Sequence, residues 1–393
     1  MAKVIVHIDL NQFFVRCEEI KNPNLVGRPV IVGGQGRAGI VSTCSYKARE
    51  RGVHSGMPTY LALRSCPEAI VLPVDHKYYS LMSREFFVFL SHYSKILEKA
   101  SVDECFMDVT DRLKNVKDVK KYFLDMQNGL FLKTGLKCSI GVAPTKFLAK
   151  MASDLHKPMG LTILHRRDFK KYIYILPVQN TFGIGKKTSP ILIEHGIRTI
   201  GDLASRLNSD DEETKNILGK FFYVIKDWLN GLGSDVVDVE DWNPKSIGKS
   251  TTFLQDTDNF EEVGGMIRSL SNAVALNAKK ENKKGTTVQL VVKDTSFRTH
   301  NKSISFKEPT NNPNTIYSRA LSLYENSFTG LLIRLVGVTL QNLVDPKDIV
   351  VQMNLFENYS QQEEKSETRL LINELNRKLD KPLFKRASEV NKK

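Results

Sequence analysis

The sequence has no long apolar run. No stretch approaches the roughly 18 consecutive apolar residues that a membrane-spanning helix needs. The apolar segment at the amino terminus, residues 1–8, is too short to be a signal peptide and is interrupted too soon by His7 and Asp9. We therefore expect a cytoplasmic protein that has no membrane partner.

Cysteine is also scarce. The chain has 5 cysteines among its 393 residues, and they are widely separated, odd in number and without a CxxC pair. This spacing argues against a disulfide framework and against a zinc site, and it favours reduced thiols. At about 100–200 residues per domain, the length predicts two to four folded units.

Acidic residues are in the minority. The chain has 44 Asp and Glu against 57 Lys and Arg, which leaves a formal net charge of +13. Such an excess of positive charge favours a polyanionic partner, and nucleic acid is the commonest one. On charge alone, a basic surface that serves only solubility remains the alternative.

The amino-terminal part of the chain predicts an α+β domain that carries a small insertion. Residues 3–9 form a nearly continuous β-branched run, which is typical of a strand buried on both faces and places Asp9 at its tip. A helix over 11–20 follows, and short strands over 29–32 and 39–43 flank a glycine-rich stretch. The sequence beyond this insertion predicts a helix over 75–96, a hairpin over 100–109 with its turn at Asp103 and Glu104, a helix over 115–133, a strand over 138–142 and a helix over 144–155.

The carboxy-terminal part predicts a helical region followed by a second domain. Residues 168–232 carry helical signals only, and the polar stretch 233–245 is typical of a linker. The elements that follow have the βαββαβ order of a ferredoxin-like unit. This unit, residues 245–343, is basic, with 13 Lys and Arg against 8 Asp and Glu. Its expected strands lie over 247–254, 286–294, 298–307 and 331–342, and its expected helices over 260–280 and 314–328.

The pair Asp103 and Glu104 is the most informative acidic feature. It lies between Val102 and an apolar stretch, where a partly buried hairpin would bring two carboxylates close together. At an effective dielectric constant near 20, two like charges about 4 Å apart repel by roughly 4 kcal/mol, so such a pair takes up a proton or a cation. Asp9 could supply a third carboxylate, and oxygen ligands of this kind suit Mg²⁺. The alternative is a turn with ordinary surface charge.

Six segments, taken together, resemble the Y-family translesion DNA polymerases of the bacterial DNA polymerase IV (DinB) and UmuC-like group. They occur in the family's order across about residues 3–343. Each segment alone is a weak signal, whereas the six in order are a specific one. The segments are HIDLNQFF (7–14), VSTCSYKARERGVHSGMP (41–58), SVDECFMDVT (101–110), GVAPTKFLAKMASDLHKPMG (141–160), FGIGKKT (182–188) and KSIGKST (245–251).

The resemblance implies a right-hand polymerase fold of the α+β class. This division agrees with the organisation predicted from the pattern of elements. The expected parts are a catalytic palm over 1–10 and 75–166, small fingers over 11–74, an all-helical thumb with a helix-hairpin-helix over 167–232, a linker over 233–244, a βαββαβ little finger over 245–343 and a tail over 344–393.

The resemblance also implies an active site. Asp9, Asp103 and Glu104 are expected to be catalytic and to bind two Mg²⁺ ions, with the Leu10 carbonyl as a further metal ligand. Many relatives have a second Asp where this chain has Asn11. Because the family does not require that residue as a ligand, we expect activity to survive the difference.

The nucleotide-binding residues are implied in the same way. Phe14 matches the family's steric gate, whose aromatic face leaves no room for the 2′-hydroxyl of a ribonucleotide. Taken alone, Phe14 would more simply be a core aromatic residue. Thr43, Tyr46, Arg49 and Lys157 match the family's triphosphate ligands, and their hydroxyl, guanidinium and ammonium groups suit phosphate oxygens.

Residues that contact phosphates are expected to bind primer–template DNA without reading its sequence. For the thumb motif, an ordinary glycine turn between helices is the alternative. The thumb candidates are Gly183, Gly185 and Lys186, the little-finger candidates are Lys245, Lys249 and Arg298, and further little-finger candidates are Lys279, Lys280, Lys283, Lys284 and Lys302. In the tail, the segment 352–356 resembles the sliding-clamp-binding peptide of bacterial polymerases, with Gln352, Leu355 and Phe356 as its contacts.

Together these features predict a template-directed, low-fidelity DNA polymerase that performs translesion synthesis by two-metal nucleotidyl transfer, as part of the SOS response to DNA damage. Its expected partners are primer–template DNA, deoxynucleoside triphosphates and the replication sliding clamp, and we expect a monomer. Two alternatives stay open: a catalytically inactive DNA- or clamp-binding scaffold of the same fold, and a nucleotide cyclase on a related palm. The intact carboxylate trio argues against the first, and the predicted DNA- and clamp-binding elements argue against the second.

Overall fold

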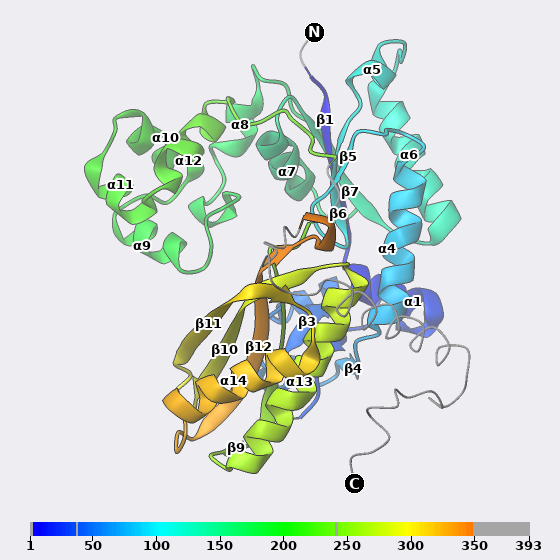
Figure 1. The fold of residues 1–393 in the computed structure, drawn as a ribbon. Helices are drawn as coiled ribbons and strands as arrows, with labels where there is room; N and C mark the ends of the chain where they lie inside the picture. Colours follow the sequence, from blue (N-terminus) through cyan, green and yellow to red (C-terminus); the bar gives the residue numbers. More distant parts are fainter. Residues whose placement is uncertain (1–2, 37, 240–242, 349–393) are drawn as a thin grey trace. The chain divides into compact units, whose positions relative to one another are not determined.

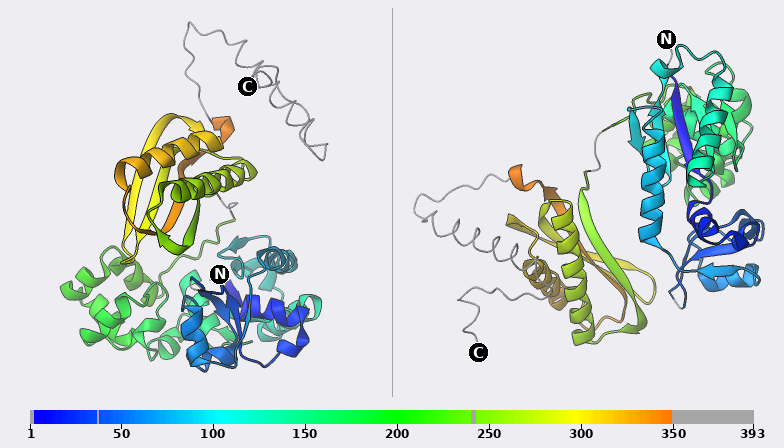
Figure 2. Two further views of the ribbon diagram at one scale, coloured as in Figure 1. Left: turned by 90° about the horizontal axis from the view of Figure 1, so that it is seen from below. Right: turned by 90° about the vertical axis from the view of Figure 1, so that its right-hand side faces the viewer.

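The computed structural model describes residues 3–36, 38–239 and 243–348. The chain divides into two compact units, residues 1–243 and 244–393 (Figure 1, Figure 2). Within the described ranges, no helix combines the length and the apolar character that crossing a bilayer requires. All five cysteines are buried and unpaired, in agreement with the reduced thiols expected from their spacing.

Unit 1 is built on a five-stranded sheet in the order β5-β6-β1-β7-β8. Strand β1 (Ile5–Leu10) lies at its centre, and every residue of β1 is buried, as its β-branched sequence predicts. It pairs antiparallel with β6 (Glu104–Asp108) and β7 (Cys138–Ala143). The edges are β5 (Leu97–Lys99), antiparallel to β6, and β8 (Leu161–Ile163), parallel to β7.

Helices cover both faces of this sheet (Figure 1). Helix α7 (Lys146–Leu155) packs against β1 and β7 on one face. Helices α4 (His76–Leu90) and α6 (Val119–Thr134) cover the other face, and the short helix α5 (Thr110–Leu113) precedes α6. The side chains of Asp75, Asp118 and Thr145 each accept a backbone N–H in the first turn of α4, α6 and α7, and so fix where these helices begin.

Side chains of β1 alternate between these two faces. Val6 and Ile8 belong to the apolar core under α4 and α6. Ile5 belongs instead to the core that contains α7. His7 and Asp9 therefore point toward α7, which makes that helix the partner of the polar side chains of the central strand.

The segment between β1 and α4 forms a second, smaller sheet in the order β3-β2-β4. It has an apolar core of its own, centred on Ile31, Ala48 and Ala62. Its strands are β2 (Val30–Gly33), β3 (Val41–Cys44) and β4 (Ile70–Leu72), and its helices are α1 (Phe13–Lys21), η1 (Pro23–Leu25), α2 (Tyr46–Arg49) and α3 (Thr59–Ser65).

Residues 168–232 contain helices and turns, as predicted. Their apolar side chains, among them Leu192, Leu203 and Phe222, form one continuous core with α7. The elements are α8 (Phe169–Ile173), η2 (Val178–Asn180), α9 (Thr188–Glu194), α10 (Ile200–Asn208), α11 (Glu212–Leu218) and α12 (Phe221–Leu229).

The stretch predicted to be a linker is partly held against unit 1. The backbone N–H of Lys146 donates to Ser234 O at 2.8 Å, and the backbone N–H of Asp238 donates to Glu98 Oε2 at 2.7 Å. Between these points Val237 is only 7% exposed and packs into the core of α7 and the helical region. Polar composition alone does not reveal this packing, because one buried valine and backbone hydrogen bonds provide it.

Unit 2 is a four-stranded antiparallel sheet in the order β11-β10-β12-β9, with both helices on one face (Figure 1). The βαββαβ order along the chain is as predicted. A ferredoxin-like sheet has its first and third strands at the centre, whereas here the second and fourth are central. The elements are β9 (Ser246–Thr257), α13 (Phe260–Lys280), β10 (Lys284–Asp294), β11 (Thr299–Thr310), α14 (Pro313–Ser327), β12 (Ile333–Val344) and η3 (Pro346–Asp348).

Two details of unit 1 differ from the sequence predictions. The hairpin turn spans residues 100–103, so Glu104 is the first residue of a strand and not part of the turn. The strands β4 and β8 were not predicted, and both are three residues long and pair in parallel. Such short strands contain too few residues for a hydrophobic alternation to be recognised.

Candidate active site

Three carboxylate residues meet at one end of the five-stranded sheet. The register of β1 against β6 sets Asp9 opposite Glu104. The backbone N–H of Leu10 donates to Asp103 O at 2.9 Å, which fixes the turn residue beside the end of β1. Cross-strand neighbours lie about 5 Å apart, so residues separated by more than ninety positions form one acidic group.

Two lysines from the α7 region neutralise this group. Lys150 Nζ lies 3.0 Å from Asp9 Oδ2 and 2.9 Å from Glu104 Oε1. Lys157 Nζ lies 2.6 Å from Asp9 Oδ2 and 2.6 Å from Asp154 Oδ1. The predicted phosphate ligand Lys157 is thus in the acidic site, where its contacts are with carboxylates.

A histidine of the central strand also reaches the site. His7 is fully buried, and its Nε2 lies 3.4 Å from Glu104 Oε2. Its Nδ1 lies 2.8 Å from Ser153 Oγ on α7. The ring packs against Phe106 at a centroid distance of 4.7 Å. His7 therefore connects the acidic group to α7.

Burial and the neighbouring polar and charged groups act in opposite directions on the pKa values of these carboxylates. Burial raises the pKa of Asp9 to about 6, although the two lysines act in the opposite direction. Burial would also raise the pKa of Glu104, but the close polar groups of His7 and Asp9 and the charge of Lys150 outweigh burial and lower that pKa. Burial raises the pKa of Asp103. Neighbouring carboxylates that are partly buried favour a bound cation, because it removes their repulsion.

The donor set fits a hard divalent cation in its chemistry. The acidic group contains carboxylate oxygens, which are ligands that Mg²⁺ prefers, and the Leu10 carbonyl is the further ligand expected from the sequence. Among the described residues, no three His, Cys, Asp or Glu side chains converge closely enough to hold an ion. The reason is visible in the contacts: Asp103 Oδ1 accepts a hydrogen bond from Ser101 Oγ at 2.6 Å, and Asp9 is engaged by the lysines.

Asn11 has a structural role in this chain. Its side chain is buried and donates from Nδ2 to Ser139 Oγ at 2.9 Å. Its Oδ1 accepts the backbone N–H of Met159 at 2.8 Å, and Met159 has a left-handed backbone with φ of 61°. Asn11 thus ties the end of β1 to the loop that carries Lys157.

Phe14 lies near the same end of the sheet, on α1. It is partly buried and stacks on Tyr79 of α4, with ring centroids 4.3 Å apart and an interplanar angle of 15°. The Tyr79 hydroxyl donates to Glu18 Oε1 at 2.7 Å, and Lys21 Nζ pairs with the same oxygen at 2.7 Å. The ring of Phe14 is therefore held by an aromatic neighbour whose own position is fixed.

The other predicted triphosphate ligands lie in the small sheet and in α2. Arg49 is exposed; its Nε donates to Cys44 O at 3.2 Å, and its guanidinium lies 5.0 Å from the centroid of the Tyr46 ring. The backbone N–H of Tyr46 donates to Gln12 Oε1 at 2.9 Å, which connects α2 to the start of α1. Thr43 is partly exposed on β3.

The glycine turn of the helical region leaves its backbone uncrowded at Gly185. Gly183 has a φ of 92°, which favours glycine, and Gly185 lies in open space. The exposed Lys186 follows, with its Nζ 3.4 Å from His54 Nδ1. Small residues and open surroundings would let the backbone approach a phosphate.

The basic residues predicted to bind DNA in unit 2 lie at its edges. Lys245 and Lys249 are exposed at the start of β9, and Arg298 is exposed in the turn before β11. Lys283 does not suit this role, because it is only 8% exposed and its Nζ pairs with Asp345 Oδ1 at 2.9 Å. A lysine that neutralises a carboxylate inside the fold cannot contact a phosphate.

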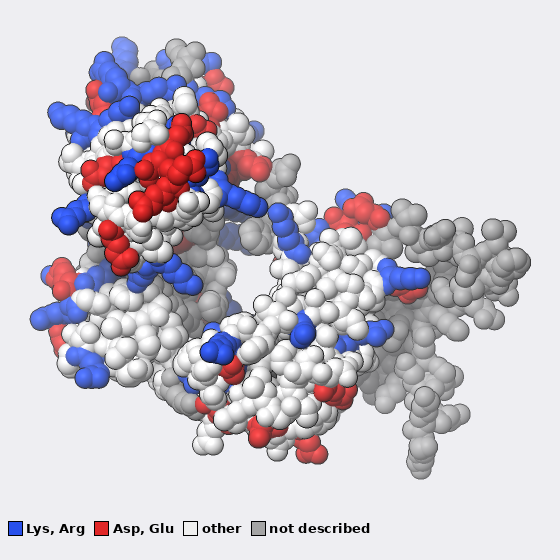
Figure 3. Space-filling model, turned by 90° about the vertical axis from the view of Figure 1, so that its left-hand side faces the viewer, with Lys and Arg blue, Asp and Glu red and all other residues white. Residues whose placement is uncertain are grey.

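The sheet face of unit 2 opposite its helices is poor in charge, and Lys293 is the one charged residue among the register-paired positions named below. Much of the surface of this unit that is visible in Figure 3 (lower right) is likewise neither acidic nor basic. The register defines this open face as Ser246, Gly248, Ser250 and Thr252 of β9, Leu335, Gly337, Thr339 and Gln341 of β12, Thr287, Gln289, Val291 and Lys293 of β10, and Thr299, Asn301, Ser303 and Ser305 of β11.

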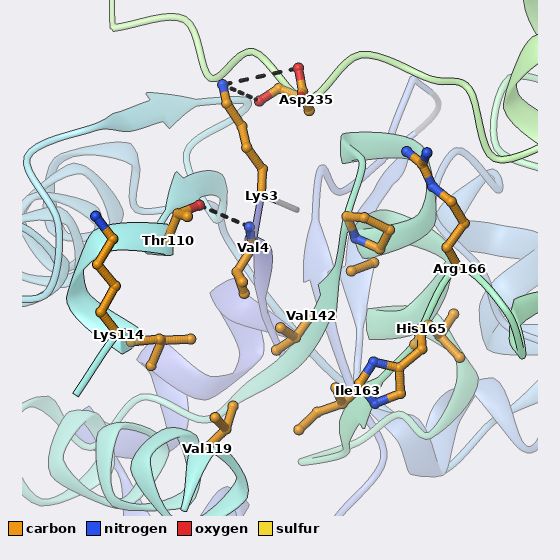
Figure 4. A pocket seen from close by; sticks show the side chains of 14 residues that line it. Lys3, Val4, Thr110, Lys114, Val119, Val142, Ile163, His165, Arg166 and Asp235 are labelled. Carbon is orange, nitrogen blue, oxygen red and sulfur yellow. Dashed lines mark hydrogen bonds and ion pairs between the residues drawn. The ribbon is translucent and has the colours of Figure 1, made fainter. Parts of the chain in front are cut away.

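The predicted clamp-binding residues Gln352, Leu355 and Phe356 lie outside the described residues. A cavity of about 850 Å³ lies at the other end of β1, remote from the acids (Figure 4). Its wall is largely apolar, with Val4, Val142 and Ile163 among its members, and the Lys3 ammonium above it donates to Asp235 O at 3.2 Å.

Sequence reasoning missed Lys150, His7 and Ser153. The available signal was the placement of Lys150 between Ala149 and Met151, within an otherwise apolar run of an amphipathic helix. A lysine on the buried side of a helix needs a carboxylate partner. The alternation of β1 then identifies Asp9 as that partner.

The chain is similar over nearly its whole length to known proteins. Residues 8–154 match the family described as the impB/mucB/samB family, and residues 244–355 match the C-terminal domain of that family. The DNA polymerase IV 1 of Halalkalibacterium halodurans is 34% identical over 99% of this chain and 94% of its own length. The DNA polymerase IV of Methanoculleus marisnigri is 38% identical over 87% of this chain and 95% of its own length.

Solved structures give the same result for the fold. The structure titled "Y-family DNA polymerase chimera Dbh-Dpo4(243-245)-Dbh" has a TM-score of 0.76 and 25% identity, and covers 87% of this chain and 99% of its own. The structure titled "Insertion ternary complex of Dbh DNA polymerase" has a TM-score of 0.61 at 25% identity, with the same coverage. The mixed α+β fold therefore matches these structures.

Proposed function

Because the chain belongs to the Y family of DNA polymerases, in the DNA polymerase IV group, we propose that it is a template-directed, low-fidelity enzyme that copies DNA past damaged bases. In the reaction, the primer 3′-oxygen attacks the α-phosphate of a deoxynucleoside triphosphate and pyrophosphate leaves. The observation that carries this proposal is the register that sets Asp9 opposite Glu104, with Asp103 beside them.

We assign the regions of the chain to the parts of a polymerase hand as follows. The five-stranded sheet and its helices would be the palm, over 1–10 and 75–166, and the small sheet would be the fingers, over 11–74. The helical region 167–232 would be the thumb. Residues 233–244 would link it to the little finger, 245–343, and residues 344–393 would be a tail.

Asp9, Asp103, Glu104 and the Leu10 carbonyl would hold two Mg²⁺ ions. When bound, Mg²⁺ would lower the pKa of the primer 3′-hydroxyl and neutralise the negative charge that develops on the phosphates. In the protein itself, Lys150 holds Asp9 and Glu104 together from α7. A charge-assisted contact of this kind keeps both carboxylates oriented before substrate arrives.

The nucleotide would lie between the palm and the small sheet. Phe14, held by Tyr79, would pack against the sugar and exclude a 2′-hydroxyl. Tyr46 and Arg49 would contact the triphosphate, with Thr43 beside them. Lys157 would exchange its contacts with the carboxylates for a phosphate oxygen, since an anionic ligand and a carboxylate compete for one ammonium group.

DNA would be held by contacts that ignore its sequence. The glycine turn at Gly183 and Gly185 would offer backbone N–H groups, and Lys186 a charge. In unit 2, Lys245, Lys249 and Arg298 would frame the open face, whose hydroxyl and amide side chains can also donate to phosphates.

Primer extension tests the proposal directly. Wild-type protein should extend a primer on an undamaged template with Mg²⁺ and fail to do so after EDTA treatment, and Asp103→Ala should be inactive while still binding the duplex. Equal primer extension by wild type and Asp103→Ala would show that this acidic group is not the catalytic site. DNA binding without any extension by wild type would favour the inactive scaffold.

We also propose that residues 352–356 bind the sliding clamp. An extended segment that offers Leu355 and Phe356 to an apolar groove is a common mode of peptide docking. Deletion of 352–356 should abolish stimulation by the clamp and leave basal synthesis unchanged. Loss of basal synthesis as well would indicate a role inside the polymerase.

A further inference from the structure

His7 contains an unusual buried nitrogen. The side chain is fully buried on the central strand, and its Nε2 makes no hydrogen bond of normal length within the described residues. Its nearest acidic partner is Glu104 Oε2, at 3.4 Å. Buried ring nitrogens nearly always have a partner, so an Nε2 that lies 3.4 Å from a site carboxylate without completing a hydrogen bond calls for an explanation.

The other ring nitrogen is held by Ser153. Ser153 Oγ lies 2.8 Å from His7 Nδ1 and also 2.8 Å from the backbone oxygen of Lys150. A serine hydroxyl has one proton, so it can donate to only one of these two acceptors at a time. If it donates to the Lys150 oxygen, a neutral His7 carries its proton on Nδ1, and the Nε2 lone pair then faces a carboxylate.

The other arrangement removes this repulsion. If the Ser153 hydroxyl donates to His7 Nδ1, the proton of the neutral ring lies on Nε2 and points toward Glu104. An N–H group facing a carboxylate attracts, whereas a lone pair facing it repels. The contacts of Ser153 and Glu104 together therefore select one tautomer of the imidazole.

We propose that His7 is a positioning residue for Glu104: Ser153 holds the imidazole in its Nε2–H tautomer, and Nε2–H donates to Glu104 Oε2. The contact is long in the protein without substrate, as catalytic hydrogen bonds often are, and tightens when the site is loaded. The inference rests on the proposed function, because orientation of Glu104 matters only if Glu104 is in the site.

Simple packing is the competing explanation. The His7 ring contacts Phe106, and an aromatic ring of similar size could fill the same space. Packing alone predicts that His7→Phe retains activity, and it assigns no role to the donor atom. His7→Gln keeps a donor near the Nε2 position and loses the ring, so the two variants separate hydrogen bonding from packing.

The tautomer can be measured without turnover. In ¹⁵N-labelled full-length protein free of metal, the ring nitrogens of His7, identified by their loss in His7→Gln, should have the shifts of the Nε2–H tautomer. In Ser153→Ala the population should move toward Nδ1–H. A wild-type ring protonated on Nδ1, or a tautomer unchanged by Ser153→Ala, would overturn the proposal.

Kinetics then test the consequence. Outer-shell partners of metal ligands typically contribute about 10–100-fold, so His7→Phe should lower kcat by that factor and raise the Mg²⁺ concentration for half-maximal rate. The KM for the nucleotide should change less than about threefold, and His7→Gln should recover most of the rate. Ser153→Ala should lose less, and should have no additional effect in the His7→Phe background, because it acts through His7.

Two controls keep the outcomes separate. Thr162→Val on β8 also alters a buried polar atom without a partner in the same sheet, and should leave kcat and the Mg²⁺ requirement unchanged. Equal losses in Thr162→Val and His7→Phe would contradict positioning. If Glu104→Gln is inactive while His7→Phe has the wild-type rate, the inference fails and the proposed function stands; if Glu104→Gln is fully active, the proposed function itself fails.

Discussion

The acidic end of the sheet in unit 1 and the open face of unit 2 are two polar surfaces made in opposite ways. At the acidic end, each of Asp9, Glu104 and Lys150 is largely buried and has named partners within 3.0 Å. On the open face, mostly uncharged side chains lie on a regular register, with Lys293 among them, and Lys245, Lys249 and Arg298 are exposed near its margins. The acidic end depends on a few contacts that influence one another, whereas the open face and its margins combine many independent contacts.

This difference predicts how each surface responds to substitution. The energetic effects of substitutions within one hydrogen-bonded network are not additive, because the loss of one side chain disturbs the contacts of the others. Exposed charges that contact phosphates contribute small, separate and salt-dependent amounts. A single change should therefore abolish what the acidic end does, and only weaken what unit 2 does.

The largest effect is expected for Glu104→Gln. Removal of one charged ligand should remove several kcal/mol of charge stabilisation and lower kcat by about 10³-fold, with DNA affinity changed by less than about twofold. Single-turnover primer extension and a separate binding titration measure both quantities. Glu98→Gln is the matched control, because Glu98 lies on neighbouring β5 and pairs with Lys146, outside the site.

The next effect concerns sugar selection. Phe14→Ala should raise the ratio of ribonucleotide to deoxynucleotide incorporation by about 10–100-fold, which corresponds to roughly 1.4–2.7 kcal/mol of discrimination. Competing single-nucleotide insertions measure it. Phe13→Leu is the control, since Phe13 is a buried core residue and should not affect the ratio. Unchanged selectivity in Phe14→Ala would remove Phe14 from the nucleotide site.

A smaller effect is expected for substitution of Tyr79, whose ring stacks on Phe14. Tyr79→Phe retains the stack on Phe14 and loses the hydrogen bond to Glu18, so it should lower the free energy of unfolding by about 1–2 kcal/mol. Sugar selection should change less than in Phe14→Ala. Urea denaturation and the same insertion assay test the two statements. A selectivity loss equal to that of Phe14→Ala would show that sugar selection depends on the hydrogen bond between Tyr79 and Glu18.

The smallest effects are expected in unit 2. Lys249→Ala and Arg298→Ala should each weaken DNA binding about two- to threefold on every sequence, and each should reduce the slope of log affinity against log salt by about 0.9. Lys121→Ala, on the surface of unit 1 and paired with Asp125, is the control. A loss above about tenfold, or an unchanged slope, would show that unit 2 does not act through independent charges.

The same contrast explains what the sequence could reveal. A β-branched run that ends in Asp9 predicts a central strand with a carboxylate at its tip, and the antiparallel hairpin then brings Glu104 to it. The strand and the hairpin follow from local patterns, whereas their meeting was expected from the resemblance to the polymerase family. Lys150 could not be assigned in that way, because a lysine in a helix ordinarily faces solvent, and only the packing of α7 on β1 shows that this one does not.

Other features were beyond local patterns for similar reasons. The order of strands in unit 2 depends on which hairpins pair, and the βαββαβ order along the chain is compatible with more than one arrangement. The contacts of Ser234 and Asp238 with unit 1 use backbone groups, which every residue has. The basic cluster around Lys283 had the composition of a phosphate site, but one of its members neutralises Asp345 inside the fold.

The buried thiols have a practical consequence. All five cysteines are buried, and burial raises the pKa of each thiol, so almost no thiolate is present at neutral pH. Maleimide dyes and spin labels should therefore react only with cysteines introduced on the surface. One such cysteine in each unit would allow fluorescence or electron-resonance measurements of the distance between the units in otherwise native protein.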